Sequence, residues 1–400
     1  MAEFIPSGGI TSPGGFSAGA VSAGIKNSKG IRLDLGILFS ELPCNAAAVF
    51  TGNKVRAAPV VLSQQRLRRG KAAALVVNSG CANACTGESG IAHSVEMTEL
   101  VARHLGLSPE NVLVASTGVI GNYMPMERVR AAIPEITLSV DGGHELAMAI
   151  MTTDTVPKEA AVSVDNGSFI IGGTAKGSGM IHPDMATLLC FLTTDAAVDI
   201  NCLRTALKKA VDISFNMVSV DSDTSTNDMV LIMANGSAGA GLITGDSSRA
   251  EIFQQALDQV CIFLAREIAR DGEGATKLIE VTVRGAASIT DARLAARAIV
   301  SSPLVKTAVH GSDPNWGRVV TAAGYSGADL VADKLDLEIC GITLVKNGCP
   351  VSFKKEKVVE LLDKNEASIL LNLNLGSGGA TAWGCDMSEE YVTINSEYTT

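Results

Sequence analysis

The sequence predicts an α/β protein, and three observations lead to this prediction. Of its 400 residues, 46% are apolar and 18% are charged, so the chain can bury a large core. Short apolar runs typical of strands alternate along the chain with stretches of helical periodicity. Aromatic residues make up only 4% of the chain while glycines number 40, so we expect an aliphatic, closely packed core with many turns.

Charge and composition argue against several classes of function. The formal net charge is −10, whereas a nucleic-acid partner would favour a basic face. The first residues, M-A-E-F-I-P-S-G-G-I, lack the basic and apolar regions of a secretory signal, and no apolar stretch is long enough to span a membrane. The nine cysteines lie in apolar contexts and are typical of reduced thiols. We therefore expect a cytoplasmic protein that acts on small molecules, with no nucleic-acid or membrane partner.

Several short apolar runs in the first half of the chain predict strands. They lie at 31–38, 46–51, 59–62, 73–77 and 112–115. Apolar residues at helical spacing predict a helix over 90–106 and another around 146–151. Asn166-Gly167 lies between two further apolar runs and predicts a hairpin.

The second half of the chain contains longer helical patterns. A buried strand is expected over 188–192, followed by a helix over 202–215. Ser248-Arg249-Ala250-Glu251 fits a capping box at the start of a long helix, and Gly272 marks the end of that helix.

The C-terminal third has a pattern of its own. The composition shifts near Gly285, between a strand that starts at Leu278 and a helix expected over 291–300. Asn347-Gly348 predicts another hairpin further on. Residues 285–400 are therefore predicted to form a smaller α/β domain.

The loop that precedes the buried strand at 188–192 carries unusual chemistry. It reads K-G-S-G-M-I-H-P-D-M-A-T from Lys176 to Thr187. An internal threonine is a poor nucleophile, but a threonine at the start of a chain carries its own base, the free α-amine. Cleavage between Ala186 and Thr187 would create such a residue.

Three other polar stretches provide candidates for a site. Ser116-Thr117-Gly118 follows the strand at 112–115, and such a turn can present a hydroxyl and a backbone N–H to a developing oxyanion. Thr152-Thr153-Asp154-Thr155 follows a predicted helix. The octet D-S-D-T-S-T-N-D at 221–228 has neither helix nor strand periodicity.

A metal site is the alternative interpretation of two patterns. The three aspartates at 221–228 could attract a divalent cation, but the glycine and distal glutamate of an EF-hand loop are missing. Cys81 and Cys85 have no second ligand pair near them in the sequence. We predict no metal site, and His182 stays open as a base for a histidine-based triad.

Together these stretches resemble the ornithine acetyltransferases (glutamate N-acetyltransferases) of arginine biosynthesis. The resemblance extends from about Gly15 to Thr400 and includes the loop at 176–187 and the stretches S-T-G-V-I-G, T-T-D-T and D-S-D-T-S-T-N-D. It implies a four-layer α-β-β-α sandwich of the self-cleaving N-terminal-nucleophile type, with a smaller C-terminal α/β domain. It also implies an alpha chain, 1–186, and a beta chain, 187–400, produced by cleavage before Thr187.

The resemblance implies roles for individual residues. Thr187 would be the nucleophile and supply the base through its amine, and Thr117 and Gly118 would form the oxyanion hole. The residues implied to bind the amino-acid substrate are Thr153, with Thr152 as the alternative, Lys176, Thr187, Glu273, Asn395 and Thr400. The C-terminal tail is expected to reach the site, with a strand-like start over 391–394.

The activity implied is ping-pong transfer of an acetyl group from N-acetyl-L-ornithine to L-glutamate without a cofactor. Bifunctional members of the family would also take the acetyl group from acetyl-CoA. The implied assembly is a heterotetramer of two alpha and two beta chains. Two alternatives stay open: a self-cleaving aminopeptidase or amidase of related architecture, and a non-catalytic amino-acid-binding protein with an uncut loop.

Overall fold

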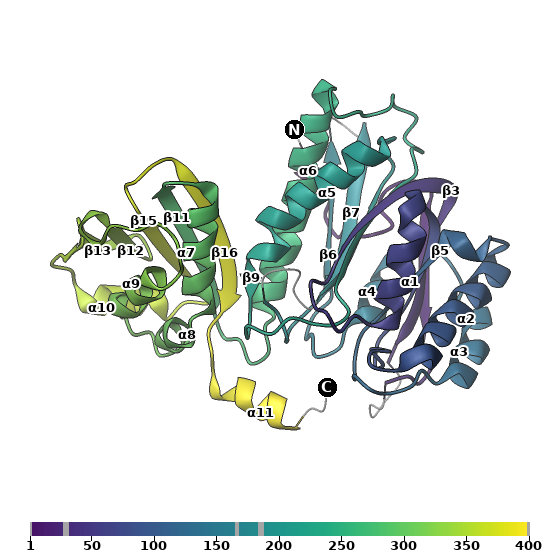
Figure 1. Cartoon of the computed structure of the whole chain (residues 1–400), viewed down its shortest axis with the longest axis horizontal. Helices are drawn as coiled ribbons and strands as arrows, with labels where there is room; N and C mark the ends of the chain where they lie inside the picture. Colours follow the sequence, from purple (N-terminus) through teal and green to yellow (C-terminus); the bar gives the residue numbers. More distant parts are fainter. Residues whose placement is uncertain (1, 27–31, 165–167, 183–187, 398–400) are drawn as a thin grey trace.

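The chain folds into two lobes around two β-sheets (Figure 1). The computed structural model describes residues 2–26, 32–164, 168–182 and 188–397. The larger lobe contains a nine-stranded sheet and the C-terminal lobe a seven-stranded sheet. No helix in the described part of the chain is both long and apolar enough to cross a membrane.

The nine-stranded sheet is mixed, and its strands run in the order β1-β6-β7-β8-β10-β3-β4-β5, with β2 paired to β3. Their bounds are β1 Ala2–Phe4, β2 Phe16–Val21, β3 Leu35–Phe50, β4 Lys71–Asn78, β5 Val112–Ser116, β6 Lys158–Val164, β7 Phe169–Lys176, β8 Leu189–Thr194 and β10 Met229–Ala234. The helices of this lobe are α1 Ala58–Arg66, α2 Gly87–Leu105, α3 Met126–Ala132, α4 Gly143–Ile150, α5 Ile200–Ile213 and α6 Ser248–Arg270.

Alternating side chains show that the two halves of this sheet face each other. In β10, Val230 and Ile232 join the core under α5 and α6, while Leu231 and Met233 join a second core. That second core also contains Leu113 of β5, which lies three strands away from β10 at the end of the strand order. Because successive side chains of a strand point to opposite faces, the second core must lie between the two halves.

A third core, under α2 and α3, covers the outer face of β4 and β5. The layers are therefore α5–α6, the β6-β7-β8-β10 half, the β3-β4-β5 half and α1–α3. This arrangement confirms the predicted four-layer sandwich, and the 16-residue strand β3 connects its two sheet layers.

The C-terminal lobe is built on the second sheet, with the strand order β14-β13-β12-β15-β11-β16-β9. Its strands are β9 Val218–Ser219, β11 Leu278–Ala286, β12 Asp336–Ile339, β13 Ile342–Lys346, β14 Cys349–Pro350, β15 Glu366–Asn372 and β16 Gly378–Cys385. Its helices are α7 Ile289–Ser301, α8 Pro303–His310, α9 Trp316–Gly324 and α10 Lys355–Leu362, and α11 Glu389–Glu397 follows it (Figure 1). One apolar core runs from α6 into this sheet, so the lobes share a hydrophobic interior.

The boundary predicted near Gly285 falls inside this second sheet. Gly285 lies within β11, and β11 pairs with β15 and β16 from Leu278 onward. The composition changes within β11, and β9 of the same sheet comes much earlier in the chain. Strand pairing therefore determines where the lobe begins, and amino-acid composition does not predict strand pairing.

Most predicted elements agree with the structure. The helix over 90–106 corresponds to α2, the runs at 73–77 and 112–115 to β4 and β5, and the helix over 202–215 to α5. The octet at 221–228 forms no helix or strand. Both predicted hairpins are antiparallel strand pairs, although Asn166 and Gly167 themselves lie outside the described residues.

Three local predictions are wrong. The run at 59–62 belongs to helix α1, where Pro59 occupies the first turn, a position that tolerates proline. Ser248 is the first residue of α6 and not its cap, and Ser247 at the cap position makes no side-chain capping bond. The tail over 391–394 is part of helix α11, in which no residue is buried, so no sheet edge holds it as a strand.

Candidate active site

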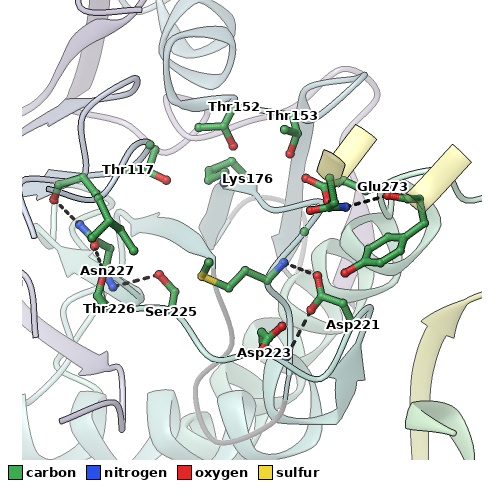
Figure 2. Close-up of a pocket in the computed structure, with 17 residues that line it drawn as sticks. Thr117, Thr152, Thr153, Lys176, Asp221, Asp223, Ser225, Thr226, Asn227 and Glu273 are labelled. Atoms are coloured by element: carbon green, nitrogen blue, oxygen red, sulfur yellow. Dashed lines mark hydrogen bonds between the residues drawn. The ribbon is translucent and has the colours of Figure 1, made fainter. Parts of the chain in front are cut away.

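A cavity of about 220 Å³ lies where the loops after β4, β5 and β7 meet the octet loop and helix α11 (Figure 2). The loop after α4 and the segment after α6 complete it. Its lining residues are mostly polar: Ala82, Thr117, Gly118, Ile120, Thr152, Thr153, Lys176, Gly179, Met180, Asp221, Asp223, Ser225, Thr226, Asn227, Glu273, Tyr391 and Asn395. The sequence predictions that fall on described residues therefore converge on a single cavity.

The predicted oxyanion pair sits at the ends of two parallel strands. β4 and β5 are parallel neighbours, and Asn78 pairs in register with Ser116. The Ser116 hydroxyl donates to Asn78 Oδ1 over 2.6 Å, and the Thr117 N–H donates to the Asn78 carbonyl over 3.0 Å. These bonds fix the turn that carries Thr117 and Gly118 at the rim of the cavity.

Gly118 cannot be exchanged for another residue without strain. Its φ is +125°, in the region that side-chain-bearing residues avoid. A Cβ at this position would lie 2.5 Å from the Gly80 carbonyl carbon and 2.7 Å from the Cys81 nitrogen. The turn after β5 therefore packs directly on the backbone that follows β4.

Asn227 of the octet loop links these two turns. Its Nδ2 donates to the carbonyls of Ala82 (2.6 Å) and Ser116 (2.8 Å). Among the described residues, neither the Thr117 hydroxyl nor the Gly118 N–H has a hydrogen-bond partner, and both residues line the cavity. The turn therefore offers a hydroxyl and a backbone N–H that have no protein partner there and can donate to a bound group, the chemistry that a developing oxyanion needs.

Lys176 supplies the positive charge of the cavity. It is the last residue of β7, is only 3% exposed, and is the only basic residue among the described residues that line the cavity. Burial lowers the pKa of the Lys176 ammonium, while the carboxylate of Asp154, with Oδ2 at 4.0 Å from Nζ, opposes that change. Thr152 and Thr153 lie beside it in Figure 2. This part of the cavity can bind a carboxylate.

Glu273 provides a carboxylate on another side of the cavity. Its Oε2 accepts a 2.8 Å bond from Asn395 Nδ2, which α11 brings from the C-terminal tail. A Cβ on Gly179 would lie 2.3 Å from the Glu273 carboxyl group, so the side chain occupies the space that this glycine leaves. Glu273 and Asn395 are 122 residues apart in the sequence but form one polar surface.

Asp221, which Figure 2 shows, and Tyr391 also line the cavity. The Asp221 carboxylate accepts the N–H groups of Met180 (2.5 Å) and Ile181 (2.8 Å), which fixes the loop after β7. Burial raises the pKa of Asp221. Burial, and then the carboxylates of Asp221 and Glu273, raise the pKa of the Tyr391 phenol. The cavity thus combines one cation, Lys176, with three carboxyl groups, those of Asp221, Asp223 and Glu273. This combination suits a substrate that carries both charges.

The predicted nucleophile and cleavage bond, Ala186 and Thr187, lie outside the described residues, as does Thr400. The chain resumes at Leu188, whose N–H donates to the buried Asp228 Oδ1 over 3.0 Å. Burial raises the pKa of Asp228 well above its ordinary range. Asp228 therefore holds the backbone directly after the predicted nucleophile.

His182, Cys81 and Cys85, which the sequence raised as alternatives, do not line the cavity. His182 Nδ1 is 3.2 Å from Ser219 Oγ, and His182 is not among the described residues that line the cavity. Cys81 is buried and its thiol donates to the Asn122 carbonyl, whereas Cys85 is exposed. In the described ranges no three His, Cys, Asp or Glu side chains are grouped as metal ligands.

Some members of the site escape sequence reasoning. Tyr391 falls in a tail that the sequence predicts to be strand-like, so nothing marks it as a lining residue. Asp154 lies in the T-T-D-T stretch, but the resemblance implies no role for it or for its partner Lys158. No local signal identifies these two, since their importance depends on a contact with a segment more than a hundred residues away.

Comparisons with known proteins identify the family of this chain. The family model for the ArgJ family matches residues 17–400. The arginine biosynthesis bifunctional protein ArgJ of Dehalococcoides mccartyi is 52% identical over 400 residues, which cover 100% of this chain and 99% of that protein. A crystal structure of arginine biosynthesis bifunctional protein ArgJ from Bacillus halodurans has a TM-score of 0.50 and 44% identity, and covers 52% of this chain and 97% of its own.

One further structure, of ornithine acetyltransferase complexed with ornithine from Mycobacterium tuberculosis, is 40% identical with a TM-score of 0.44 and covers 47% of this chain and 100% of its own. The family match and the 52% identity over the whole length show that the chain belongs to the ArgJ family.

Proposed function

We propose that this chain is a self-cleaving acetyltransferase of arginine biosynthesis that moves the acetyl group of N-acetyl-L-ornithine to L-glutamate. The observation that carries the proposal is the convergence on one cavity of an oxyanion turn, a buried lysine and a carboxylate–amide pair. The relatives at about this chain's full length are named as arginine biosynthesis bifunctional proteins, which supports the assignment. The reaction as proposed needs no metal or organic cofactor.

Cleavage between Ala186 and Thr187 would make Thr187 the first residue of a beta chain, 187–400. The solved Bacillus halodurans chain supports this step, because nearly all of that chain corresponds to only about half of this one. A family member cut near its middle would have such chains. The anchoring of Leu188 by Asp228 is a second support, because it ties the new chain end to the octet loop.

In the proposed first half-reaction, Thr187 Oγ attacks the acetyl carbonyl carbon of N-acetylornithine. The hydroxyl proton passes to the Thr187 amine, directly or through a water molecule. The Thr117 hydroxyl and the Gly118 N–H stabilise the oxyanion. When the tetrahedral intermediate collapses, the carbon–nitrogen bond breaks, the ornithine nitrogen takes the proton, and an acetyl ester remains on Thr187.

In the second half-reaction, the α-amine of glutamate attacks this ester. It loses its proton to the Thr187 amine, and the collapse of the second intermediate returns that proton to Thr187 Oγ. N-acetylglutamate leaves and the free hydroxyl is restored. The same oxyanion turn serves both steps, because both pass through the same kind of tetrahedral anion.

The charges in the cavity suit the amino-acid part of the substrate. Lys176 and Thr153 would bind a carboxylate, with Thr152 next to them. Glu273, supported by Asn395, would bind an ammonium group, and Thr400 would contribute from the end of the tail. A buried carboxylate and a buried ammonium at separate places would orient a zwitterionic substrate in one direction.

Three finer features belong to the same proposal. Acetyl-CoA would serve as a second acetyl donor to Thr187, which would fit the word bifunctional in the names of the relatives. The assembly would contain two alpha and two beta chains. The enzyme would act in the cytoplasm, where its amino-acid substrates are available.

Cleavage and transfer can be tested on one preparation. Intact-mass measurement should find residues 1–186 and 187–400 as separate chains, and N-terminal sequencing of the second should begin T-L-L-C-F. Thr187→Ala should stay a single chain and be inactive. An uncut but active protein would contradict the mechanism, since the Thr187 amine would then be part of a peptide bond.

The acceptor decides between the enzyme classes. We expect ornithine release from N-acetylornithine to depend on glutamate and to produce N-acetylglutamate. Release at the same rate without glutamate would indicate a hydrolase of the aminopeptidase or amidase type. An uncut chain that binds the substrate without releasing ornithine would indicate a binding protein.

A further inference from the structure

Four charged side chains of alternating sign lie buried behind the cavity. Lys176 Nζ is 4.0 Å from Asp154 Oδ2, Asp154 Oδ1 accepts a 2.7 Å bond from Lys158 Nζ, and the same Nζ donates to Asp271 Oδ2 over 2.6 Å. The side chains of Lys158 and Asp154 are 1% and 0% exposed, and those of Lys176 and Asp271 are 4% and 7% exposed. Only Lys176 also lines the cavity.

The carboxylate of Asp154 also holds two backbone segments. Its Oδ2 accepts the N–H of Thr152 over 3.0 Å, and its Oδ1 accepts the N–H of Gly177 over 2.7 Å. One of these segments carries Thr153 and the other begins with Lys176. A single buried side chain thus fixes both parts of the proposed carboxylate subsite.

Asp271 continues the connection to the acidic side. Its carboxylate accepts the N–H of Thr155 over 3.0 Å and also the Thr155 hydroxyl, and its carbonyl accepts the Ser178 hydroxyl over 2.6 Å. The Ser178 carbonyl in turn accepts the N–H of Glu273 over 2.9 Å. The segments that carry Thr153, Lys176 and Glu273 are therefore joined through this chain of charges.

We propose that Asp154 and Lys158 are positioning residues for substrate binding: Asp154 holds Lys176 in place, and Lys158 joins Asp154 to Asp271 so that the segments carrying Thr153, Lys176 and Glu273 keep their relative positions. The inference rests on the proposed function only in taking Lys176 as the group that binds the substrate carboxylate. Neither residue needs to touch the substrate.

A role in stability alone explains the four buried charges less well than a role in positioning Lys176. Buried ion pairs can often be replaced by apolar residues without loss of stability, so stability alone gives no reason to keep four buried charges. A lysine that must stay protonated while buried does give such a reason, because burial disfavours its charged form.

The charges that face Lys176 come from several elements. Asp154, Glu273 and Asp228 favour its ammonium form, while Lys158 opposes it, and the attraction of Asp154 exceeds the repulsion of Lys158. Lys26, on the segment after β2, also interacts with both Lys176 and Asp154. Among these neighbours, Asp154 is therefore the residue whose replacement should most reduce the positive charge of Lys176 at alkaline pH.

The test uses three variants of the full-length, cleaved enzyme and one control. Asp154→Asn removes one negative charge and leaves the cluster with an excess positive charge. The double variant Asp154→Asn/Lys158→Gln makes the net charge of the cluster zero again. It can therefore be measured even if the single variant folds poorly. Lys158→Gln completes the cycle. Asp212→Asn is the control, because it breaks the exposed pair of Lys208 with Asp212 on α5, which is also an i,i+4 lysine–aspartate pair.

We expect Asp154→Asn to lower kcat/KM for N-acetylornithine about 10- to 100-fold, mainly through KM, as a displaced binding group would. The alkaline limb of its pH profile should move to lower pH by about one unit, since Lys176 would lose its proton earlier. The double variant should recover the thermal midpoint of the wild type but keep the raised KM, and its limb should move only part of the way back, because Lys158 no longer repels the Lys176 ammonium. Asp212→Asn should change none of these quantities.

The outcomes separate a positioning role from a structural one. If KM and the alkaline limb return to wild-type values together with stability in the double variant, the cluster only stabilises the fold and the proposal is wrong. Wild-type KM and pH profile in Asp154→Asn would also overturn it.

A second measurement does not depend on activity. The rate at which acetic anhydride labels Lys176, followed by peptide mass spectrometry across pH, reports the protonation of that amine directly. A shift of the labelling curve to lower pH in Asp154→Asn supports the proposal, and an unchanged curve refutes it. If the wild type releases no ornithine, the proposed function fails, and this curve still decides the role of Asp154.

Discussion

The cavity has two walls, and the chain holds them in place by different interactions. The wall that we call the oxyanion wall is neutral and consists of Thr117, Gly118 and Asn227. The wall that we call the amino-acid wall contains the hydroxyl, charged and amide groups that would bind the substrate, namely Thr153, Lys176, Glu273 and Asn395.

The oxyanion wall is fixed by backbone packing and by hydrogen bonds of the uncharged side chains of Asn78, Ser116 and Asn227. Its turn follows β5, packs against the turn after the neighbouring parallel strand β4, and has no room for a Cβ at Gly118. The amino-acid wall is fixed by charge and by distant contacts, such as Lys158 with Asp271 at a separation of 113 residues. Substitutions that add atoms to the oxyanion wall should therefore lower kcat. Substitutions that change the charge or remove polar contacts of the amino-acid wall should raise KM.

The largest effect should come from Gly118→Ala, which adds one methyl group to the oxyanion wall. The new Cβ would overlap the Gly80–Cys81 backbone, so the turn must move and carry its N–H away from the oxyanion. We expect kcat per cleaved enzyme to fall by roughly 10³-fold or more, with slower self-cleavage and a lower thermal midpoint. Mass spectrometry gives the cleaved fraction, and steady-state kinetics give kcat.

Gly121→Ala is the matched control for this substitution. Gly121 lies in the same loop and also has a positive φ, +85°, but a Cβ added there would have no atom within 4 Å. It carries the backbone strain without the overlap. Equal losses in the two variants would mean that strain alone, and not the packing of the two turns, explains the effect.

A smaller effect is expected from Thr117→Val, which removes the hydroxyl and keeps the shape of the side chain. Loss of one oxyanion donor should lower kcat by roughly 10²- to 10³-fold with little change in KM. Thr117→Ser keeps the hydroxyl and should retain most of the activity. A wild-type kcat in Thr117→Val would show that the hydroxyl does not contact the reacting carbonyl.

The two walls also differ in how far the sequence predicts them. The apolar runs at 73–77 and 112–115 and the polar stretches after them predict strands that end in a site, and Thr117 and Gly118 lie there. Strand ends and glycine turns are local features, so periodicity and residue type are sufficient to predict them.

The amino-acid wall could be predicted only in part. Resemblance identifies its residues, but no local pattern reveals that Asp154 would meet Lys158 and Asp271, because burial and sheet pairing bring them together. The failures elsewhere have a similar cause. The run at 59–62 lies in helix α1, and Ser63 of that helix exchanges hydrogen bonds with the backbone of Val114 on the outer strand β5, a distant contact that the run itself does not reveal.

The tail shows the same limit. Residues 391–394 have a composition that suits a strand, but α11 packs closely on Gly274, where a Cβ would lie 2.4 Å from the Tyr391 nitrogen. The absence of a side chain at Gly274 permits this approach. The tertiary contact decides the position of the tail, and with it the arrival of Tyr391 and Asn395 in the cavity.

The smallest effect is expected from Asn395→Ala, at the outer edge of the amino-acid wall. The variant loses the 2.8 Å bond from Asn395 Nδ2 to Glu273 Oε2 and leaves the carboxylate in place. Because the bond is partly exposed to solvent, its loss should raise KM for N-acetylornithine only about 3- to 10-fold, with kcat and self-cleavage unchanged.

Val392→Ala is the control for this change, since Val392 is 65% exposed on the same helix and should leave KM unaltered. Steady-state kinetics on the fully cleaved proteins separate the outcomes. A fall in kcat at constant KM would mean that Asn395 acts as the residues of the oxyanion wall are expected to act. The proposed difference between the two walls would then be wrong. An unchanged KM would mean that α11 only covers the cavity, and that Glu273 binds the substrate without help from the tail.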